Sequence, residues 1–555
     1  MSEETKLSAL EGVKEASRFL RGSIAEELAS SEPSVSGDTA NLLKFHGTYQ
    51  QDDRDHRGGG DKDYIFMVRS RIPGGKVSAA QFLAELDLCE RYGNGTLRVT
   101  DRQGFQLHGV HKGDLKAAIR GINDVKLSTQ SACGDVCRNF MCCPAPIKNS
   151  PVRAEMQTLA HALADHFRPK SAAYYEIWLK DGDSSEKVHE VTDEHEPIYG
   201  KTYLPRKFKM GIALPEDNCI DVYTQDLGFL AIVEGGRIVG YNVLPGGGMG
   251  MTPAKKDTFP AVAKRLTFVP PDRVIPVAEA IVKVQRDHGN RADRKLARMK
   301  YLIANWGLER FKAMVEEYYG AKLPEPHPAD VTDVDDHIGW HEQGDGRLFL
   351  GLNIENGRIK DEGDFCLKTA IRALLAKYPV ETRLTALQSV LFCDLEPSAK
   401  ADVEAILRDH GIPLAADLTL ARRYAIACPA YPTCGLAVTE SERVMPQVLD
   451  TIEAELNRQG LIGERVAIHM TGCPNGCGRP YTPDIGLVGK AKNKYTLYLG
   501  GNAQGTRLAF LYRDMVPQEE IASTLAPIFS KWKAERSSGE SFGDFCDRVG
   551  KESLA

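Results

Sequence analysis

No run of apolar residues in this 555-residue chain approaches the length needed to cross a bilayer. Residues 1–6 are acidic and lack the apolar stretch of a signal peptide. The net charge of −6 gives no indication of nucleic-acid binding. The thirteen cysteines are an odd number in a long chain, which argues against a disulfide framework and favours metal ligation in a reducing compartment. We therefore expect a cytoplasmic protein without membrane or nucleic-acid partners.

The composition is that of a folded globular protein, with 42% apolar and 26% charged residues, and the length allows about two to four domains. Near the amino terminus, helical periodicity predicts an amphipathic helix with Leu7, Leu10, Val13 and Ala16 along one face. A glycine-rich stretch at 57–61 has the composition of a linker.

Two short-looped cysteine pairs, set among proline and glycine, lie in the last third of the chain. Five residues separate Cys428 from Cys434, and three separate Cys473 from Cys477. Such pairs hold zinc or an iron–sulfur cluster, and the wider loops suit the separated iron corners of a cubane. The neighbouring glycines would let backbone N–H groups turn toward the cluster sulfurs. The alternatives are a structural zinc ion and four unrelated buried thiols.

The chain also repeats itself weakly at a long period. Segments 98–103 and 383–388 match at Arg, Thr and Gln, while 226–248 and 484–501 share an Asp-X-Gly start and a glycine-rich end. The order predicts a duplicated two-part module with a pseudo-twofold axis and a cleft between its halves, where a large cofactor could bind. Strands outside simple βαβ order indicate an α+β fold. The predicted helices are 80–92, 276–288, 291–304, 309–319, 366–377 and 443–458, and the predicted strands include 208–214 and 229–233.

The cysteine pairs and several basic segments resemble the sulfite and nitrite reductase haemoproteins, which couple a [4Fe–4S] cluster to sirohaem. Segments 66–75, 97–109 and 203–209 carry this resemblance further, and it covers nearly the whole chain. The cluster ligands that it implies are Cys428, Cys434, Cys473 and Cys477. It also implies that Cys477 is the axial ligand of the sirohaem iron.

The resemblance implies an internally duplicated α+β fold, with ferredoxin-like half-domains and two sirohaem- and cluster-binding domains around a pseudo-twofold axis. The implied units are an amino-terminal arm at 1–57, half-domains at 58–128 and 332–412 that form one domain, a sirohaem and substrate domain at 129–331, and a cluster domain at 413–555.

Sirohaem carries many carboxylates, so a protein that buries it must supply cations and amide donors. By the resemblance, the anion pocket on the open face of the haem is lined by Arg69, Arg138, Lys207 and Lys209. The residues implied to hold the cofactors are Arg98, Thr100, Arg102, Gln106, His108, Arg206, Arg294, Arg298 and Asn475. Taken singly, each basic residue is more often a solvated charge, and His108 is more often a satisfied core histidine.

The substrate that the resemblance favours is sulfite. Lys207 and Lys209 alternate with Phe208, which puts both ammonium groups on one face of a strand. They are also better proton donors than the more basic guanidinium groups. Nitrite reductases of the family tend to have Asn at the position of Lys209, and a second ammonium suits dianionic sulfite better than nitrite. Nitrite is the alternative substrate and an expected side activity.

The electron donor is expected to be a separate protein, because the chain shows no flavin or nicotinamide module. Segments 131–135, 298–307, 340–346 and 427–430 resemble the ferredoxin-dependent branch. We therefore expect a monomeric, assimilatory enzyme that receives its electrons from ferredoxin. The alternative is a haemoprotein subunit fed by an NADPH-dependent flavoprotein. Hypotheses of other classes are a haem-free iron–sulfur carrier and a zinc-stabilised binding module.

The chain departs from the family pattern at several cysteines. Cys137 stands where members have Asn, and Cys142-Cys143 is an unusual doublet. Cys133, Cys137 and Cys142 could suggest a second cluster, but the family pattern leaves no place for one. Some ferredoxin-type members place a Tyr and a Cys together beside the haem, and Tyr49 and Cys133 correspond to those positions. A covalent link between them is a hypothesis.

Overall fold

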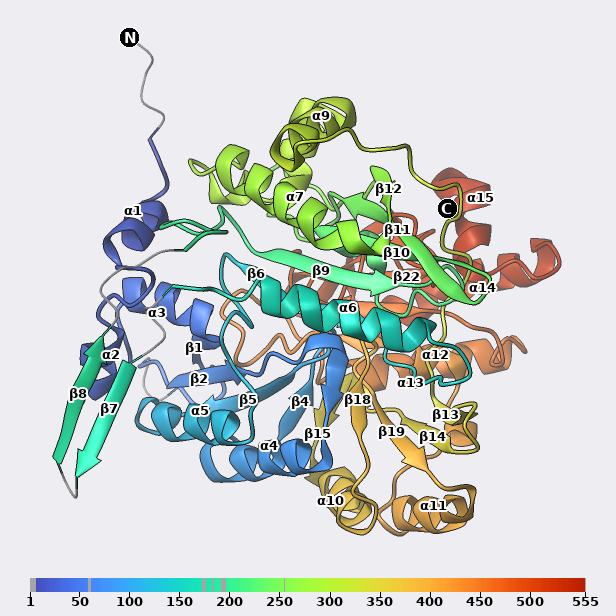
Figure 1. The fold of residues 1–555 in the computed structure, drawn as a ribbon. Coiled ribbons are helices and arrows are strands. Elements are labelled where there is room, and N and C mark those ends of the chain that lie inside the picture. Colours follow the sequence, from blue (N-terminus) through green and yellow to red (C-terminus); the bar gives the residue numbers. More distant parts are fainter. Residues whose placement is uncertain are drawn as a thin grey trace.

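The protein is built from four five-stranded sheets flanked by helices (Figure 1), which confirms the predicted α+β class. The computed structural model describes residues 6–57, 61–171, 176–181, 184–190, 196–253 and 255–554. Residues 58–60 of the predicted linker lie outside the described residues. Across the described ranges, no helix is long and apolar enough to cross a membrane.

Two of the sheets each include one strand from the other half of the chain. β3 pairs with β18, so that Lys76 lies opposite Arg383, and β15 pairs with β4, so that Arg358 lies opposite Arg98. This reciprocal exchange confirms the first predicted repeat and gives the two halves one shared hydrophobic core. The first sheet consists of β1 (Thr48–Asp52), β2 (Tyr64–Arg69), β5 (Phe105–Val110), β4 (Leu97–Val99) and β15 (Arg358–Ile359). The second consists of β13 (Gly339–Glu342), β14 (Leu348–Leu352), β19 (Val390–Leu395), β18 (Thr382–Leu384) and β3 (Lys76–Val77).

Helices cover one side of both exchanged sheets, along the lower edge of the view in Figure 1. They are α4 (Ala79–Tyr92), α5 (Leu115–Asp124), α10 (Leu367–Lys377) and α11 (Lys400–Asp409). α4 and α10 contact each other across the boundary between the halves. Their apolar residues fill the shared core because both helices present one hydrophobic face to the sheets.

The two larger sheets repeat one topology. Starting from the edge strand β6 in one sheet and β20 in the other, the first two pairs of neighbouring strands are parallel and the next two are antiparallel. This match confirms the second predicted repeat. One sheet consists of β6 (Cys137–Cys142), β9 (Phe208–Ala213), β10 (Leu227–Glu234), β11 (Arg237–Pro245) and β12 (Thr267–Val269). The other consists of β20 (Ile426–Ala427), β21 (Ile468–Thr471), β22 (Ile485–Ala491), β23 (Lys494–Leu499) and β24 (Phe510–Pro517).

The remaining elements pack around these sheets or form short hairpins. The helices are α6 (Val152–His166), α7 (Val274–His288), α8 (Met299–Trp306), α9 (Leu308–Tyr319), α12 (Leu420–Arg423), α13 (Met445–Arg458), α14 (Ile521–Glu535) and α15 (Phe542–Leu554). The hairpin strands are β7 (Glu176–Asp181) with β8 (Ser184–Glu190) and β16 (Asp361–Glu362) with β17 (Phe365–Cys366). Helices predicted at 276–288, 309–319 and 443–458 are confirmed.

The helix predicted at 291–304 is wrong in its first half. The structure has only a short 3-10 turn before α8, which begins at Met299. The Asn290 side chain accepts the N–H groups of the two residues that follow Arg291, and the Asp293 side chain accepts the N–H of Lys295 at 2.9 Å. These local bonds compete with helical ones and hold the chain in turns.

The amino-terminal arm begins with α1 (Ala9–Ala16), but the buried face of this helix is polar. Leu7 and Ala16 are exposed, whereas Glu11 and Lys14 are buried and paired at 2.5 Å. Glu11 also pairs with Arg291 at 2.5 Å. The predicted apolar face is therefore wrong at both of its ends, because the helix docks through ion pairs. The arm continues with α2 (Ile24–Ala29) and α3 (Gly37–Leu43).

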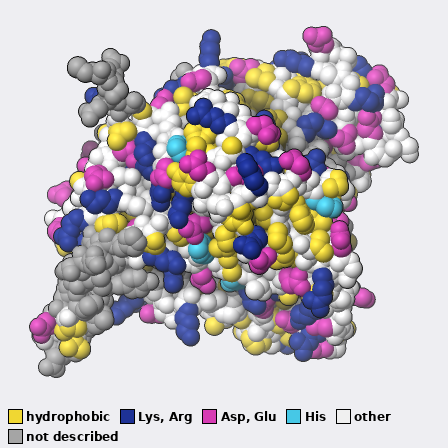
Figure 2. All heavy atoms as spheres, turned by 45° about the horizontal axis from the view of Figure 1, so that its top comes forward, with side chains coloured by type: hydrophobic (Ala, Val, Ile, Leu, Met, Phe, Trp, Pro, Cys, Tyr) yellow, Lys and Arg dark blue, Asp and Glu magenta, His cyan; other side chains and the backbone are white. Residues whose placement is uncertain are grey.

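The surface seen when the top of Figure 1 is turned toward the reader carries both signs of charge. Figure 2 shows Lys and Arg side chains interspersed with Asp and Glu over this face, with apolar side chains between them. A mixed surface of this kind produces no extended field of one sign.

Candidate cofactor and anion site

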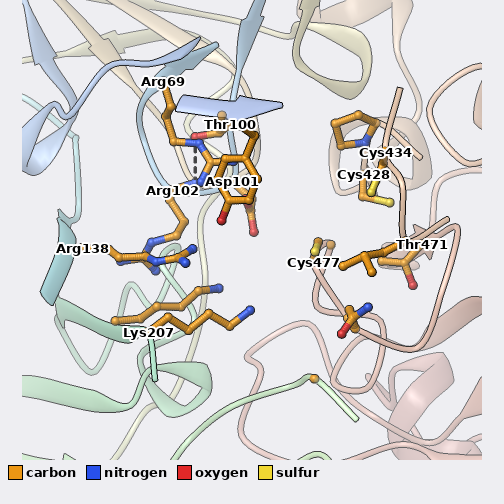
Figure 3. A pocket seen from close by; sticks show the side chains of 18 of the residues that line it. Arg69, Thr100, Asp101, Arg102, Arg138, Lys207, Cys428, Cys434, Thr471 and Cys477 are labelled. Carbon is orange, nitrogen blue, oxygen red and sulfur yellow. Dashed lines mark hydrogen bonds between the residues drawn. The ribbon is translucent and has the colours of Figure 1, made fainter. Parts of the chain in front are cut away.

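One cavity of ≈ 350 Å³ gathers all of the site residues predicted from the sequence. Basic side chains line one wall and the cysteines lie on the opposite wall (Figure 3). The predicted residues that line it are Arg69, Arg98, Thr100, Arg102, Gln106, His108, Arg138, Arg206, Lys207, Lys209, Arg294, Arg298, Cys428, Cys434, Cys473, Asn475 and Cys477. Residues far apart in the chain thus meet at one place, as a bound cofactor would require.

The cysteine wall is positioned by two parallel strands. Cys428 directly follows β20 and Cys473 lies shortly after β21, and these strands pair in parallel. Carboxyl ends of adjacent parallel strands lie at the same edge of a sheet, so the two cysteine loops are brought together. The Gly472 N–H donates to the Cys428 sulfur at 3.3 Å, and the Asn475 amide donates to the Cys473 sulfur at 3.4 Å. Backbone and side-chain donors therefore point at the sulfurs.

The spacing of the four thiols suits a cluster better than one ion. Within the described part of the chain, they do not form a group of three ligand atoms within 4.8 Å of one another. A tetrahedral zinc ion requires such closeness, whereas a cubane holds its thiolates further apart. Burial and the nearby Cys477 sulfur raise the pKa of Cys473 to about 11 and also raise the pKa of Cys428 and Cys434. Stable thiolates here require compensation by bound iron, so the donor set fits a [4Fe–4S] cluster.

Arg54, which the sequence gave no reason to select, braces the cysteine loop from the amino-terminal arm. Its guanidinium donates to the carbonyls of Pro432 at 2.8 Å, Ala437 at 3.1 Å and Cys434 at 2.5 Å. It also lies 3.6 Å from the centroid of the Tyr431 ring. Three carbonyl acceptors and one aromatic face fix the loop that carries two of the four cysteines.

The four cations predicted for the anion pocket lie on the opposite wall. Like Arg102 and Lys44, which also line the cavity, they form no ion pair with a carboxylate of the described residues. They are Arg69, Arg138, Lys207 and Lys209, and together they form what we call the anion wall. Arg69 donates to the Cys133 sulfur at 3.2 Å, and Arg138 donates to the Gly134 carbonyl at 3.1 Å. Arg138 is buried and the other three are half-buried. Asp101, which lines the same cavity, offsets part of the charge at Lys209. Cations gathered at a cavity without direct ion pairs form a site for an anionic ligand.

The two lysines are the most strongly perturbed of these cations. Burial, with Arg102 close by, lowers the pKa of Lys209 to about 7. Burial and the charge of Lys209 lower the pKa of Lys207 well below its ordinary value. Phe208 between them is buried, and both lysines face the cavity, as the strand alternation predicts. A bound anion would favour their protonated forms.

Other cations at the cavity already have protein carboxylates as partners. Arg98 pairs with Glu442 at 2.9 Å and Arg298 pairs with Asp226 at 2.6 Å. Asp135 lies 2.7 Å from Arg294 and also close to Arg206, at 3.8 Å. The sequence did not distinguish these neutralised cations from those without a carboxylate partner among the described residues, because the partners come from distant segments.

Several buried polar atoms at the cavity have no hydrogen-bond partner within the described residues. They include both ring nitrogens of His108, Nε of Arg102 and the hydroxyl of Thr471. Burial and the neighbouring Arg358 lower the pKa of His108 well below its ordinary value, so the ring is neutral. Unpaired buried groups of this kind are rare unless a ligand satisfies them. They fit a polar macrocycle such as sirohaem.

Two basic residues that neighbour predicted site residues in the sequence do not line the cavity. Arg71 instead donates to the Ala164 carbonyl at 2.8 Å, and Lys295 is exposed. Conversely, Lys44 and Arg479 line the cavity although the sequence analysis did not select them. Arg479 stands two residues after Cys477, at the end of the second cysteine motif, whereas Lys44 lies in no motif.

Tyr49 and Cys133 lie beside the cations of the anion wall. Arg138 hydrogen-bonds the Tyr49 hydroxyl, while Arg69 contacts the Cys133 sulfur. Burial, followed by the neighbouring Cys133, raises the pKa of Tyr49. The covalent link between these two residues stays a prediction.

Two protein-family models match this chain. The model of the "Nitrite and sulphite reductase 4Fe-4S domain" matches residues 160–323 and 421–555. The model of the "Nitrite/Sulfite reductase ferredoxin-like half domain" matches residues 57–125 and 341–410. Each domain is matched twice, in agreement with the duplicated sheets.

Curated relatives match over almost the whole chain. The "Sulfite reductase [ferredoxin]" of Synechococcus elongatus is 45% identical over 564 residues, covering 99% of this chain and 90% of the relative. The "Sulfite reductase [NADPH] hemoprotein beta-component" of Geobacillus thermodenitrificans is 46% identical over 552 residues, covering 98% and 96%. The solved structure of the Mycobacterium tuberculosis NirA protein has a TM-score of 0.81 at 23% identity, covering 100% of this chain and 98% of that one, and supports the fold alone.

Proposed function

The chain belongs to the nitrite and sulfite reductase family, and we propose that it is a sulfite reductase haemoprotein that reduces sulfite to sulfide with sirohaem and a [4Fe–4S] cluster. One observation carries the proposal: across a single cavity, four cysteines face a group of cations, among them Arg69, Arg138, Lys207 and Lys209, that form no carboxylate ion pair in the described chain. The similar relatives from Synechococcus elongatus and Geobacillus thermodenitrificans are both named sulfite reductases.

The cysteine wall would hold the cluster, with Cys477 also serving as the ligand to the sirohaem iron. Cys477 is exposed to the cavity whereas Cys428 and Cys473 are buried, which supports this division. His108 and Arg102, with their unpaired buried nitrogens, would hold the macrocycle. When bound, the two cofactors supply the electron-transfer chemistry that no side chain provides.

The anion wall would bind sulfite and deliver protons. Arg69 and Arg138 can hold oxyanion oxygens by forked hydrogen bonds. Each oxygen that leaves sulfite as water takes up two protons, so proton donors must lie beside the substrate. Burial lowers the pKa of Lys209 to about 7, and a bound anion would restore its proton. Lys209 can therefore hold a proton beside sulfite and give it up more readily than an ordinary ammonium group. Lys207 is the second donor on the same face.

We also propose the domain division stated from the sequence. Pairing of β3 with β18 and of β15 with β4 supports the union of 58–128 and 332–412 in one domain. The two larger sheets fall in 129–331 and 413–555. The cavity is lined by residues from each of these units and from the arm at 1–57.

The electron donor that we propose is ferredoxin, with an NADPH-dependent flavoprotein as the alternative. The relatives include both kinds at nearly equal identity, 45% and 46%. The proposal therefore rests on the ferredoxin-type segments of the sequence. Nitrite remains the second candidate substrate because the family model covers both activities.

The decisive experiment combines an optical spectrum with donor-specific assays of the purified holoenzyme. We expect sirohaem bands, sulfide from sulfite with reduced methyl viologen, and sulfide with reduced ferredoxin. Sulfide with methyl viologen and with an NADPH-reduced flavoprotein, but not with ferredoxin, would change the donor and keep the enzyme. A protein produced with ample sirohaem and iron that shows no haem bands would refute the proposed function.

A further inference from the structure

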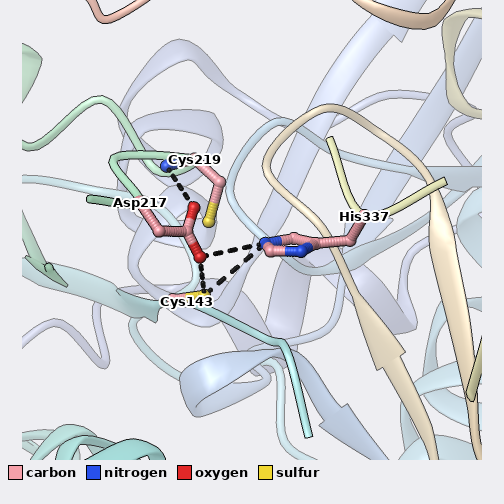
Figure 4. A group of neighbouring side chains, drawn as sticks. All are labelled: Cys143, Asp217, Cys219 and His337. Atoms are coloured by element: carbon pink, nitrogen blue, oxygen red, sulfur yellow. Dashed lines mark hydrogen bonds and ion pairs between the residues drawn. The ribbon is translucent and has the colours of Figure 1, made fainter. Parts of the chain in front are cut away.

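A second group of ligand-type side chains is buried away from the cavity. Cys143, Asp217, Cys219 and His337 place one ligand atom each within 4.8 Å of one another (Figure 4). All four are buried, with His337 the most exposed at 4%. None of them lines the cavity described above. The group combines two thiols, an imidazole and a carboxylate, which is a complete ligand set for a tetrahedral ion.

The distances within the group approach those around one metal ion. Asp217 Oδ2 lies 3.1 Å from His337 Nε2, and the Cys143 sulfur lies 2.8 Å from Asp217 Oδ2 and 3.7 Å from His337 Nε2. Zinc bonds of about 2.3 Å to sulfur and about 2.0–2.1 Å to nitrogen or oxygen separate tetrahedral ligands by roughly 3.3–3.8 Å. Small side-chain shifts would therefore admit the ion. The cavity cysteines, in contrast, are more widely spaced.

The charges also balance around a divalent ion. Two thiolates and one carboxylate carry three negative charges, and Arg153 contacts both Cys143 and Asp217, the latter at 2.8 Å. One divalent cation and the Arg153 guanidinium together neutralise the three anions. A net charge of zero matters because an uncompensated charge at a buried site is costly.

The position of the group in the fold is equivalent to that of the cavity cysteines. Cys143 directly follows β6 and Cys428 directly follows β20, the corresponding strand of the other larger sheet. Asp217 and Cys219 lie in the loop after β9, and Cys473 lies in the loop after the corresponding β21. Both ligand sets are thus presented by the same two neighbouring loops of a repeated topology.

We propose that Cys143, Asp217, Cys219 and His337 bind a structural zinc ion. Burial leaves no coordination position open to a substrate, so the ion is structural rather than catalytic. His337 precedes β13, so coordination ties the second exchanged sheet to the sheet that contains β6 and β9. The site does not depend on the proposed function, because none of its ligands belongs to the cofactor cavity.

The test measures zinc in the holoenzyme, produced in zinc-supplemented medium, by mass spectrometry of the metals with protein quantified by amino-acid analysis. We expect about one zinc ion per chain, and a zinc-edge X-ray absorption spectrum with sulfur near 2.3 Å and nitrogen or oxygen near 2.0 Å in about equal number. Cys219→Ser and His337→Gln should each remove most of the zinc. Cys393→Ser, which alters an equally buried thiol outside the group, should retain it.

Two results would overturn the proposal. The first is a zinc content of the wild-type holoenzyme that is no higher than that of Cys219→Ser. A Cys143–Cys219 disulfide, found by peptide mass spectrometry, would explain such a result. The other is zinc whose absorption spectrum shows no sulfur ligands, which is adventitious binding. If the variants fail to fold, the zinc content and spectrum of the wild-type protein still decide the question. Iron content and sulfide production measured on the same samples report separately on the proposed function.

Discussion

Gln103 and Gln388 make the same pair of hydrogen bonds in the two halves of the molecule. Gln103 accepts from the Cys142 N–H at 2.9 Å and donates to its carbonyl at 2.8 Å. Gln388 accepts from the Ala427 N–H at 3.2 Å and donates to its carbonyl at 2.9 Å. Both glutamines have left-handed backbones, with φ of +52° and +64°. Each fixes the last residue of an edge strand, and the residue that follows is a cysteine of a ligand set.

This relationship predicts different consequences for two matched substitutions. Gln388→Met should leave the buried N–H of Ala427 unpaired, at about 1–3 kcal/mol, and displace Cys428. The Ala427 carbonyl loses one of two donors and keeps Arg98, at 2.8 Å. We expect lower iron and acid-labile sulfide per chain. Gln103→Met should destabilise the fold to a similar extent but keep the cluster. Equal cluster contents in the two variants would show that the contact does not position Cys428.

Lys209→Asn should shift the preference from sulfite toward nitrite. The substitution removes one of two ammonium groups on the anion wall, and the loss weakens binding of a dianion more than of a monoanion. We expect the ratio of kcat/KM for sulfite over nitrite to fall about tenfold, or about 1.4 kcal/mol. Lys295→Asn, which removes an exposed lysine away from the cavity, is the control. An unchanged ratio would remove the reason for choosing sulfite.

Cys477→Ser should abolish sulfide formation. Of the four cysteines proposed to bind the cluster, Cys477 is the exposed one, and it lines the cavity. Within the described site, none of the other three can replace its thiolate as the ligand of the sirohaem iron. We expect activity to fall by more than about a hundredfold, together with altered sirohaem bands. Cys546→Ser, at a buried cysteine outside the cavity, should keep wild-type rates. Wild-type turnover by Cys477→Ser would refute the ligand assignment.

Arg54→Ala should destabilise the cluster without changing its ligands. The variant loses three hydrogen bonds to carbonyls of the loop that carries Cys434, and the stacking on Tyr431. We expect the cluster absorbance to decay in air about tenfold faster, as for the loss of other groups that orient metal ligands. Arg57→Ala, which removes an exposed pair with Asp52, serves as the control. Equal decay rates in the two variants would exclude a bracing role.

The buried carboxyl of Glu85 should make the free energy of unfolding depend on pH, whether or not the cofactors are bound. Burial raises the pKa of its carboxyl from 4.5 to about 7, although Ser70 donates a hydrogen bond to it. The folded state therefore binds more protons than the unfolded state between pH 4.5 and about 7, so this contribution is complete below pH 4.5 and lost as the pH rises through 7. The loss amounts to about 3 kcal/mol.

Glu85→Gln should remove this dependence. The difference in melting temperature, variant minus wild type, should therefore increase from pH 5 to pH 8, as measured by thermal unfolding at both values. Glu90→Gln changes an exposed carboxylate on the same helix and is the matched control. A constant difference for Glu85→Gln across this range would show that the carboxyl ionises normally in the folded protein.

Sequence alone determined the features that short-range patterns encode. The spacing of Cys428 with Cys434 and of Cys473 with Cys477 predicted one metal centre, because ligands in a short loop must lie near each other. Alternation around Phe208 placed Lys207 and Lys209 on one face, and the structure confirms this. The weak repeats predicted the duplicated fold for the same reason: similar local patterns form similar elements.

Some local predictions were wrong where side chains competed with the expected pattern. Asn290 and Asp293 hold turns in place of the first half of the predicted helix at 291–304. Glu11 and Lys14 are buried where an apolar face was expected, because each finds a charged or polar partner far away in the chain. Periodicity reports the average hydrophobicity of a face and not the partners that a particular contact supplies.

Tertiary structure alone decided which charges remain available for a ligand and which ligands meet. Arg98 and Arg69 look alike in the sequence, yet Arg98 meets Glu442 whereas Arg69 has no carboxylate partner in the described chain. Cys143 and His337 are 194 positions apart and come together only when β6 and the segment before β13 pack side by side. Charge compensation and metal coordination depend on distances of a few ångströms between distant segments, and these distances exist only in the folded chain.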